Sequence, residues 1–201
     1  MAADARSALR HAVASFPSIA VGAALGVALG AALGITSGAL EAEAAGLARI
    51  APDAVADAAK ALNAARRIWI AGFRSCRSVA ELLNYQLRLF RPDEVHLVGG
   101  SGPEDLDLGA FQRGDAVVVI GFAPYSRPSV LSARGAHDSG ATLIAIADAI
   151  TAPMAEGADH LLLYEAAASP GFFPSLTGAI AIAQSLAAVT FVLGGAKAKR
   201  R

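Results

Sequence analysis

Five short apolar runs, separated by segments of helix length, constrain the fold of this 201-residue chain more than any other feature. Near-continuous apolar runs of this length are typical of strands that are covered on both faces. Parallel neighbours need crossover connections, which helices between the runs would supply. We therefore expect an α/β fold, a three-layer αβα sandwich of the flavodoxin-like kind around a five-stranded parallel sheet. The strands are predicted at residues 67–72, 94–98, 116–122, 142–147 and 159–164.

The segments outside these runs predict helices. Residues 41–66 predict two short helices that break at Ala51, because the residue before a proline is disfavoured in a helix and Pro52 suits a first turn. Residues 78–90 predict a helix after the first strand, and residues 172–193 predict a long helix that covers the sheet. One domain over residues 41–195 follows, with a solvated basic tail at residues 196–201.

Residues 1–40 have a different composition from the rest. No charged side chain lies between His11 and Glu41, and small residues recur at every fourth position. Such a stripe lets two helix backbones approach closely, and its length permits a membrane span. Alanine and glycine contribute little to membrane insertion, so a linker or an interface helix is favoured here, and a membrane-anchored protein is the alternative. The stripe consists of Gly22, Gly26, Gly30 and Gly34.

Charge and cysteine content exclude several functions. Seventeen basic and seventeen acidic residues give no net field that would attract nucleic acid or an anionic membrane. The single Cys76 excludes an intrachain disulfide, and no cluster of cysteine and histidine has the spacing of zinc ligands. We therefore expect a cytoplasmic protein without a structural metal and without a cofactor.

Two strand-to-helix turns carry hydroxyls and arginines. The first is "GFRSCRS", residues 72–78, and the second is "GFAPYSRPS", residues 121–129. Backbone N–H groups at a helix start, with hydroxyls and guanidinium groups nearby, favour an anion. Neither turn has the glycine and lysine spacing of a Walker A or dinucleotide motif. Alternatively, Ser75 or Ser78 caps the helix through its side chain and the arginines lie in solvent.

The position of the two turns favours the anion site over two unrelated caps. Ligands of parallel α/β sheets bind beyond the carboxyl ends of the strands, where the strand order reverses. Turns after the first and third strands should meet at that edge and close around one phosphate. The predicted ligand-binding residues are Arg74, Ser75, Cys76, Ser78, Ser126, Arg127 and Ser129.

Three blocks of the sequence resemble the SIS (sugar isomerase) domain of the MurR/RpiR family of bacterial transcription regulators. They are "RRIWIAGFRSCRSVAELLNYQLRLFRP", "GDAVVVIGFAPYSRPSVLSARGAHDSGATLIAIADAITAPMAEGADHLLL" and "FFPSLTGAIAIA". In that family a helix-turn-helix domain binds DNA, while the SIS domain senses a phosphosugar and mediates dimer or tetramer assembly. The resemblance implies phosphosugar contacts from residues 75–78, Ser126 and Ser129.

The sequence departs from the family pattern at the site and at the N-terminus. Cys76 stands where the first loop usually has its key serine, Gly121 replaces a commoner serine, and Pro128 stands where glutamate is frequent. A thiol is a weaker donor than a hydroxyl, which implies reduced affinity or a changed ligand. Residues 1–40 show no two capped helices joined by a tight turn. We therefore expect DNA binding only if a helix-turn-helix domain is supplied.

Two classes of function remain open. The favoured one is the effector-sensing and oligomerisation module of an RpiR-type regulator, which binds a sugar phosphate, forms a homodimer or homotetramer and is no enzyme. The alternative is a sugar-phosphate aldose–ketose isomerase, which needs a base that moves a proton between adjacent carbons. No motif fixes a pair of candidates for that role. The candidates are Glu81, His96, His137 and Glu165.

Overall fold

The computed structural model describes residues 30, 34, 37–100, 110–166 and 174–198. The chain divides into two compact units, residues 1–42 and 43–201. In the first unit, residues 30, 34 and 37–42 are helical. Most of the glycine stripe lies outside the described residues.

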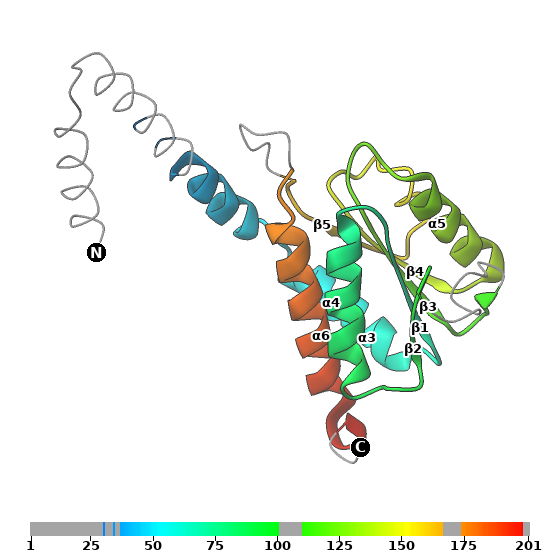
Figure 1. Ribbon diagram of the computed structural model, residues 1–201. Coiled ribbons are helices and arrows are strands. Elements are labelled where there is room, and N and C mark those ends of the chain that lie inside the picture. The colour runs from blue at the N-terminus through cyan, green and yellow to red at the C-terminus, as the bar shows by residue number, and fades with distance from the viewer. Residues whose placement is uncertain (1–29, 31–33, 35–36, 101–109, 167–173, 199–201) are drawn as a thin grey trace, which may run out of the picture. The chain divides into compact units, whose positions relative to one another are not determined.

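Five strands form the sheet of the second unit (Figure 1). They lie in the order β2-β1-β3-β4-β5, and every neighbouring pair is parallel. The predicted parallel sheet is thus confirmed, and each strand agrees with its expected range to within one residue at either end. The strands are β1 (Ile68–Gly72), β2 (Val95–Leu97), β3 (Ala116–Gly121), β4 (Thr142–Ala147) and β5 (His160–Leu163).

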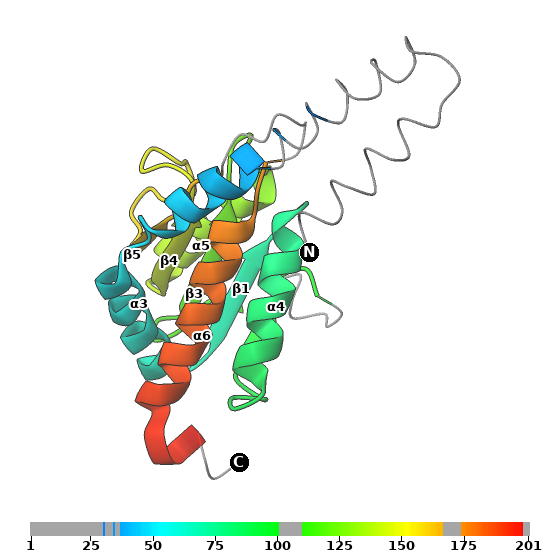
Figure 2. The same ribbon diagram turned by 90° about the vertical axis from the view of Figure 1, so that its left-hand side faces the viewer.

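Helices cover both faces of the sheet, as the apolar runs predict. Figure 2 shows α3, α6 and α4 side by side over one face, while α5 lies over the other. Alternate residues of each strand supply the two cores: Ile68 and Ile70 of β1 pack on the three-helix side, and Trp69 and Ala71 pack on the α5 side. The helices are α3 (Pro52–Ala64), α4 (Cys76–Arg88), α5 (Arg127–Ser139) and α6 (Thr177–Ala198).

Some helix boundaries agree with expectation and others differ. The predicted break before Pro52 is present, since α3 begins there. However, α4 begins two residues earlier than expected, at Cys76. The last helix begins at Thr177, where the hydroxyl of Ser175 accepts the Thr177 N–H at 3.1 Å. It continues to Ala198, so part of the predicted tail is helical, and residues 199–201 lie outside the described residues.

Helix α6 is apolar over most of its length. Its window Thr177–Gly194 has a mean hydropathy of 1.7, which is long and apolar enough to cross a membrane by length and composition alone. It lies between α3 and α4 in the helical layer and contacts both (Figure 2). Of this window 39% is buried, and its exposed residues are polar or small until the last turns, where Phe191, Val192 and Leu193 are exposed.

A buried carboxylate stabilises the amino end of the sheet through several hydrogen bonds. Asp115 immediately precedes β3, and its side chain is fully buried. It accepts hydrogen bonds from Arg67 Nη2 at 2.8 Å, from Trp69 Nε1 at 3.2 Å and from the Gln112 backbone N at 3.1 Å. Burial by itself raises the pKa of this carboxyl, but these bonds outweigh burial and hold the pKa below its ordinary value.

Replacing Asp115 with asparagine should lower the free energy of unfolding by about 3 kcal/mol at pH 7, because buried donors lose a charged acceptor. A lowered pKa in the folded state stabilises the protein above the ordinary aspartate pKa, and this contribution is lost as pH falls through the folded-state value. The difference between wild type and Asp115→Asn should therefore shrink below about pH 4.

Urea denaturation across pH 3–8 measures both effects. Asp57→Asn is the control, because Asp57 is exposed and its substitution should leave the free energy of unfolding nearly unchanged. An Asp115→Asn protein as stable as wild type at pH 7 would contradict this account of the carboxylate.

Candidate functional site

The topology brings the first and third strand-to-helix loops to neighbouring positions. β1 pairs with β2 on one side and with β3 on the other, so the strand order reverses between β1 and β3. The chain leaves β1 into α4 and leaves β3 into α5, on opposite faces of the sheet. Residues 73–78 and 122–129, called the loop pair below, follow these two strand ends.

Arg74 connects the two halves of the loop pair. Its Nη1 donates a hydrogen bond to the backbone oxygen of Pro124 at 3.3 Å. Its backbone has a φ of 55°, a left-handed conformation that residues other than glycine rarely adopt. Such conformations are found most often at functional sites, where the surrounding structure enforces them. The hydrogen bond from Arg74 therefore joins the first loop to the second.

Glycines end both β1 and β3, and neighbouring atoms leave little room for a Cβ at either position. A Cβ on Gly72 would lie 2.5 Å from the backbone oxygen of Cys76, in the first turn of α4. A Cβ on Gly121 would lie 2.5 Å from the sulfur of Met154 and 3.9 Å from Oγ of Ser129. A side chain at position 72 would therefore collide with the backbone of α4, whereas a side chain at position 121 would collide with the side chain of Met154.

The serines of the first loop do not cap α4 with their side chains. Ser75 occupies the position before the helix, is exposed and makes no capping bond. In the described part of the chain its hydroxyl has no hydrogen-bond partner. Ser78 donates from Oγ to the Ser75 backbone oxygen at 2.8 Å. The hydroxyl of Ser75 is therefore available to a ligand.

Arg77 is directed away from the loop pair. Its Nη1 donates to the backbone oxygens of Val98 at 3.0 Å and Gly99 at 3.1 Å, just beyond β2. Its Nε donates to Glu81 at 2.9 Å. Arg77, the second arginine of "GFRSCRS", therefore lies on the β2 side of α4.

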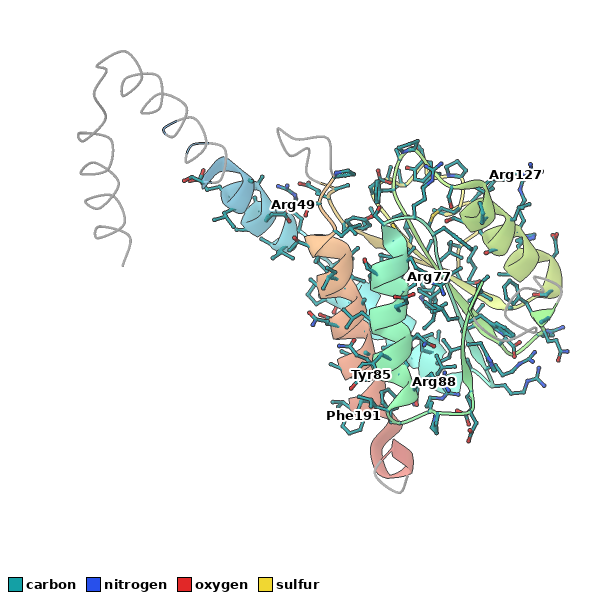
Figure 3. All side chains as sticks on the ribbon, viewed as in Figure 1. Arg49, Arg77, Tyr85, Arg88, Arg127 and Phe191 are labelled. Carbon is teal, nitrogen blue, oxygen red and sulfur yellow. The ribbon has the colours of Figure 1, made fainter. Side chains whose placement is uncertain are left out.

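The second loop combines a helix cap with an exposed cation. Ser126 Oγ accepts the Ser129 N–H at 3.2 Å and lies 2.7 Å from Ser129 Oγ. Ser129 is only 2% exposed, whereas Ser126 is partly exposed. Arg127 is exposed at the start of α5 (Figure 3). Ser126 and Arg127 therefore lie at the surface of this loop. The buried Ser129 hydrogen-bonds to Ser126 from the interior.

Three residues at the site were missed by the sequence analysis. Asp148 directly follows β4, and its carboxylate accepts bonds from Tyr125 Oη at 2.8 Å and from the Ala123 backbone N at 3.2 Å. Burial and the Asp148 carboxylate raise the pKa of Tyr125 to about 12, so Tyr125 is a donor at neutral pH. Tyr164, after β5, donates to the Gly121 backbone oxygen at 3.4 Å. The sequence could have indicated Asp148, because it is a polar residue directly after a buried strand.

Cys76 lies beneath the loop pair and not on its surface. It is 3% exposed and belongs to the core on the three-helix side. Burial and the charge of Asp148 raise the pKa of its thiol to about 11, so the thiol is protonated at neutral pH. The Cys76 side chain therefore lies in the core and does not face solvent at the loop pair.

The four acid–base candidates do not gather at the loop pair. Glu81 pairs with Arg77 on α4, and Glu165 pairs with Arg49. His96 stacks on Trp69 with 4.6 Å between ring centroids, and His137 lies in the last turn of α5, toward the amino end of the sheet. Among the described residues, no three histidine, cysteine or acidic side chains are grouped as metal ligands would be.

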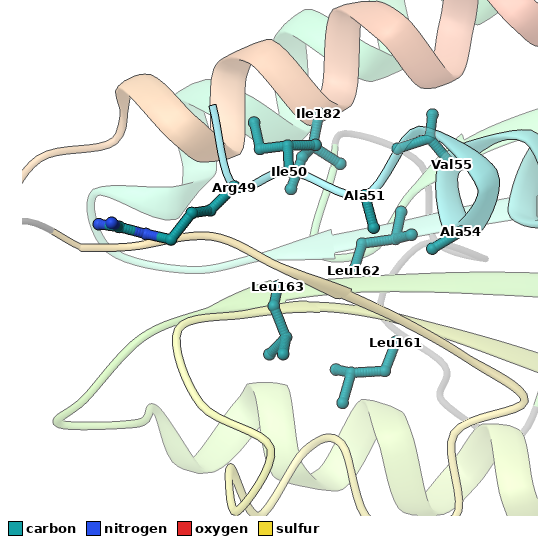
Figure 4. Close-up of a pocket in the computed structure, with 9 residues that line it drawn as sticks. All are labelled: Arg49, Ile50, Ala51, Ala54, Val55, Leu161, Leu162, Leu163 and Ile182. Atoms are coloured by element: carbon teal, nitrogen blue, oxygen red, sulfur yellow. The ribbon is translucent and has the colours of Figure 1, made fainter. Parts of the chain in front are cut away.

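A cavity of about 140 Å³ lies elsewhere, between β5, α3 and the segment that precedes α3 (Figure 4). Its lining is aliphatic apart from Arg49, which pairs with Glu165. Such a lining offers almost no polar side chain to a sugar, so the loop pair remains the candidate site. The lining residues are Arg49, Ile50, Ala51, Ala54, Val55, Leu161, Leu162, Leu163 and Ile182.

Comparison with known proteins identifies this fold. The SIS domain model matches residues 61–192. The sugar isomerase domain of an RpiR transcription factor from Sphaerobacter thermophilus superposes with a TM-score of 0.73 at 22% identity, over 84% of this chain and 93% of that one. No curated protein sequence matches the chain.

Two further structures share the fold and were solved with ligands. NanR of Vibrio vulnificus, complexed with ManNAc-6P, has a TM-score of 0.67 at 15% identity over 90% of this chain and 70% of that one. A protein of Escherichia coli CFT073, in complex with A5P, has a TM-score of 0.63 at 16% identity over 79% of this chain and 87% of that one.

Gly72→Ala should lower the free energy of unfolding by about 2 kcal/mol, because the first turn of α4 must move away from β1. Gly121→Ala should lower it by less than about 1 kcal/mol, because the flexible Met154 side chain can adjust. Thermal and urea denaturation of the two variants measure the difference. Equal losses, or a larger loss for Gly121→Ala, would show that the backbone approach at Gly72 is not a constraint.

Proposed function

Because the chain belongs to the SIS domain family, we propose that it binds a phosphosugar at the loop pair. In this proposal it is the effector-sensing and oligomerisation module of an RpiR-type transcription regulator and catalyses no reaction. It acts in the cytoplasm as a homodimer or homotetramer. Control of transcription then requires a helix-turn-helix domain, because a chain with no net charge does not attract DNA.

The hydrogen bond from Arg74 to Pro124 carries the proposal, because it joins two loops that both bear hydroxyl groups. The loops offer a phosphate the Ser75 hydroxyl, the Ser126 hydroxyl and the Arg127 guanidinium group. The starts of α4 and α5 add the positive ends of two helix dipoles. Charged hydrogen bonds of this kind are strong enough to select phosphorylated sugars.

The remaining polar groups suit the sugar itself. Tyr125 and Asp148 lie on the β4 side of the loop pair and combine a donor with a carboxylate acceptor. A carboxylate there favours sugar hydroxyls and disfavours a second phosphate. We assign the phosphate to Ser75, Ser126 and Arg127, and the sugar hydroxyls to Tyr125 and Asp148. In this arrangement Ser78, Cys76 and Ser129 support the loops from within.

The comparisons support a phosphosugar as the ligand class. The Vibrio vulnificus and Escherichia coli proteins of this fold were solved with ManNAc-6P and A5P. The Sphaerobacter thermophilus domain belongs to an RpiR transcription factor. Isomerase activity has weaker support, because Glu81, Glu165, His96 and His137 are engaged elsewhere in the structure.

Ser75→Ala is the cleanest test of the phosphate contact, because the Ser75 hydroxyl has no partner within the described residues. We expect it to weaken phosphosugar binding by roughly ten- to a hundredfold with no loss of stability. Ser126→Ala should weaken binding similarly and also lower stability by about 1 kcal/mol, because it removes the α5 cap. Ser139→Ala, at the other end of α5, is the matched control.

Calorimetric titration with a panel of phosphosugars and their unphosphorylated counterparts measures these effects. Analysis of the same mixtures for isomerised sugar separates binding from catalysis. Equal affinity for phosphorylated and unphosphorylated sugars, or unchanged binding by Ser75→Ala and Ser126→Ala, would refute the site. Steady formation of an isomerised product would favour the enzyme.

A further inference from the structure

Asp148 carries a negative charge that no cation of the described chain balances. The residue is partly buried directly after β4. Its carboxylate accepts two hydrogen bonds from neutral donors, Tyr125 Oη at 2.8 Å and the Ala123 backbone N at 3.2 Å. No lysine, arginine or histidine whose side chain the structure describes forms an ion pair with it. A partly buried carboxylate without a counter-charge attracts a cation more strongly than one in open water.

The charge of Asp148 also acts on the groups around it. Burial and the Asp148 carboxylate raise the pKa of Tyr125 to about 12 and the pKa of the Cys76 thiol to about 11. Both groups are acids, and a negative charge nearby disfavours their anionic forms. They are neutral at neutral pH, so they do not balance the carboxylate. The same charge favours a positive group at this edge of the sheet.

The arginines of the loop pair lie on the other side of the candidate site. Arg74 donates to a backbone oxygen of the second loop, and Arg77 donates to Glu81 and to a backbone oxygen beyond β2. Arg127 is exposed at the start of α5 (Figure 3). These loops follow β1 and β3, whereas Asp148 follows β4, which pairs with β3 on the side away from β1. The site is therefore positive beside β1 and β3 and negative beside β4.

The spacing of the strands sets the distance between these two regions. Neighbouring strands of a sheet lie about 4.8 Å apart. A phosphate held midway between the loops after β1 and β3 lies about 7 Å from the line of β4, because one and a half strand spacings separate them. One phosphorylated monosaccharide can extend over this distance. The site thus suits a ligand with a phosphate at one end and a positive charge at the other.

Given the proposed phosphosugar site, on which this step rests, we infer that the loop pair selects a phosphosugar with a free amino group and that Asp148 determines this selectivity. The phosphate lies against the serines and Arg127, and the ammonium group donates to Asp148. An ammonium group balances the carboxylate and offers three donors, whereas a hydroxyl offers one donor and no charge. An N-acetylated amine has lost its charge. Tyr125 remains for a neighbouring hydroxyl of the sugar.

Three hexose 6-phosphates that differ at one carbon test the inference. They are glucosamine 6-phosphate, glucose 6-phosphate and N-acetylglucosamine 6-phosphate. Calorimetric titration of the full chain at about pH 6.5 keeps the free amine protonated. We expect glucosamine 6-phosphate to bind at least about tenfold more tightly than either of the others, because only its amine forms a charged hydrogen bond with Asp148.

Asp148→Asn should reduce this preference to less than about twofold, since the amide keeps an acceptor for Tyr125 but loses the charge. Tyr125→Phe should retain the preference, because the carboxylate remains. Asp138→Asn is the matched control for the loss of one negative charge. Asp138 has an 81%-exposed side chain in the last turn of α5, so the preference should not change. Circular dichroism and thermal unfolding establish that each variant is folded.

The outcomes separate this inference from the site itself. Equal affinities for the three sugars, all weakened by Ser75→Ala, would leave the phosphosugar site in place and overturn the inference. A preference for glucosamine 6-phosphate that persists in Asp148→Asn would overturn the role of Asp148. Failure of all three sugars to bind would refute the site and the inference together. The wild-type comparison needs no substitution, so it decides the ligand class even if Asp148→Asn does not fold.

Discussion

The parallel pairing of β1 with β2 on one side and β3 on the other is the constraint on which the rest of this structure depends. Right-handed crossovers then place the helix that leaves β1 and the helix that leaves β3 on opposite faces of the sheet. Their first turns separate at the carboxyl edge, so the loops after β1 and β3 lie side by side there. Gly72 allows the α4 side of this arrangement to close tightly.

The two ends of the sheet differ in how their polar groups are satisfied. At the amino end, Asp115 is fully buried and accepts bonds from Arg67, Trp69 and the Gln112 N–H, so that cluster has a structural role. At the carboxyl end, the hydroxyl of Ser75 has no partner within the described residues. Arg127 is exposed nearby. Polar groups left available at a topological switch point are what a ligand site requires.

The sequence predicts the strands well because each is buried on both faces, which leaves an apolar run with sharp ends. It predicts helix starts less well, since α4 begins at Cys76 through a left-handed Arg74 that no propensity indicates. The loops that form the site follow from the order of the elements. The direction of each side chain does not follow from that order. Arg77, for example, points toward β2.

Contacts between distant segments explain the other differences. Asp148 lies 23 residues from Tyr125 in sequence, and only the β3–β4 pairing brings them together. Cys76 belongs to the same turn as Ser75, yet it is buried because the helical period points it toward the core. Local patterns therefore identify the turns, and the packed structure decides which of their residues face a ligand.

The central claim is that the loops after β1 and β3 bind one phosphate together. Amide chemical shifts recorded during titration with a phosphosugar test it most directly, because they report on each loop separately. The account predicts that amides of residues 73–78 and of residues 122–130 shift together with a single dissociation constant, while those around Asp115 do not move. Shifts confined to one loop, or two different constants for the two loops, would contradict it.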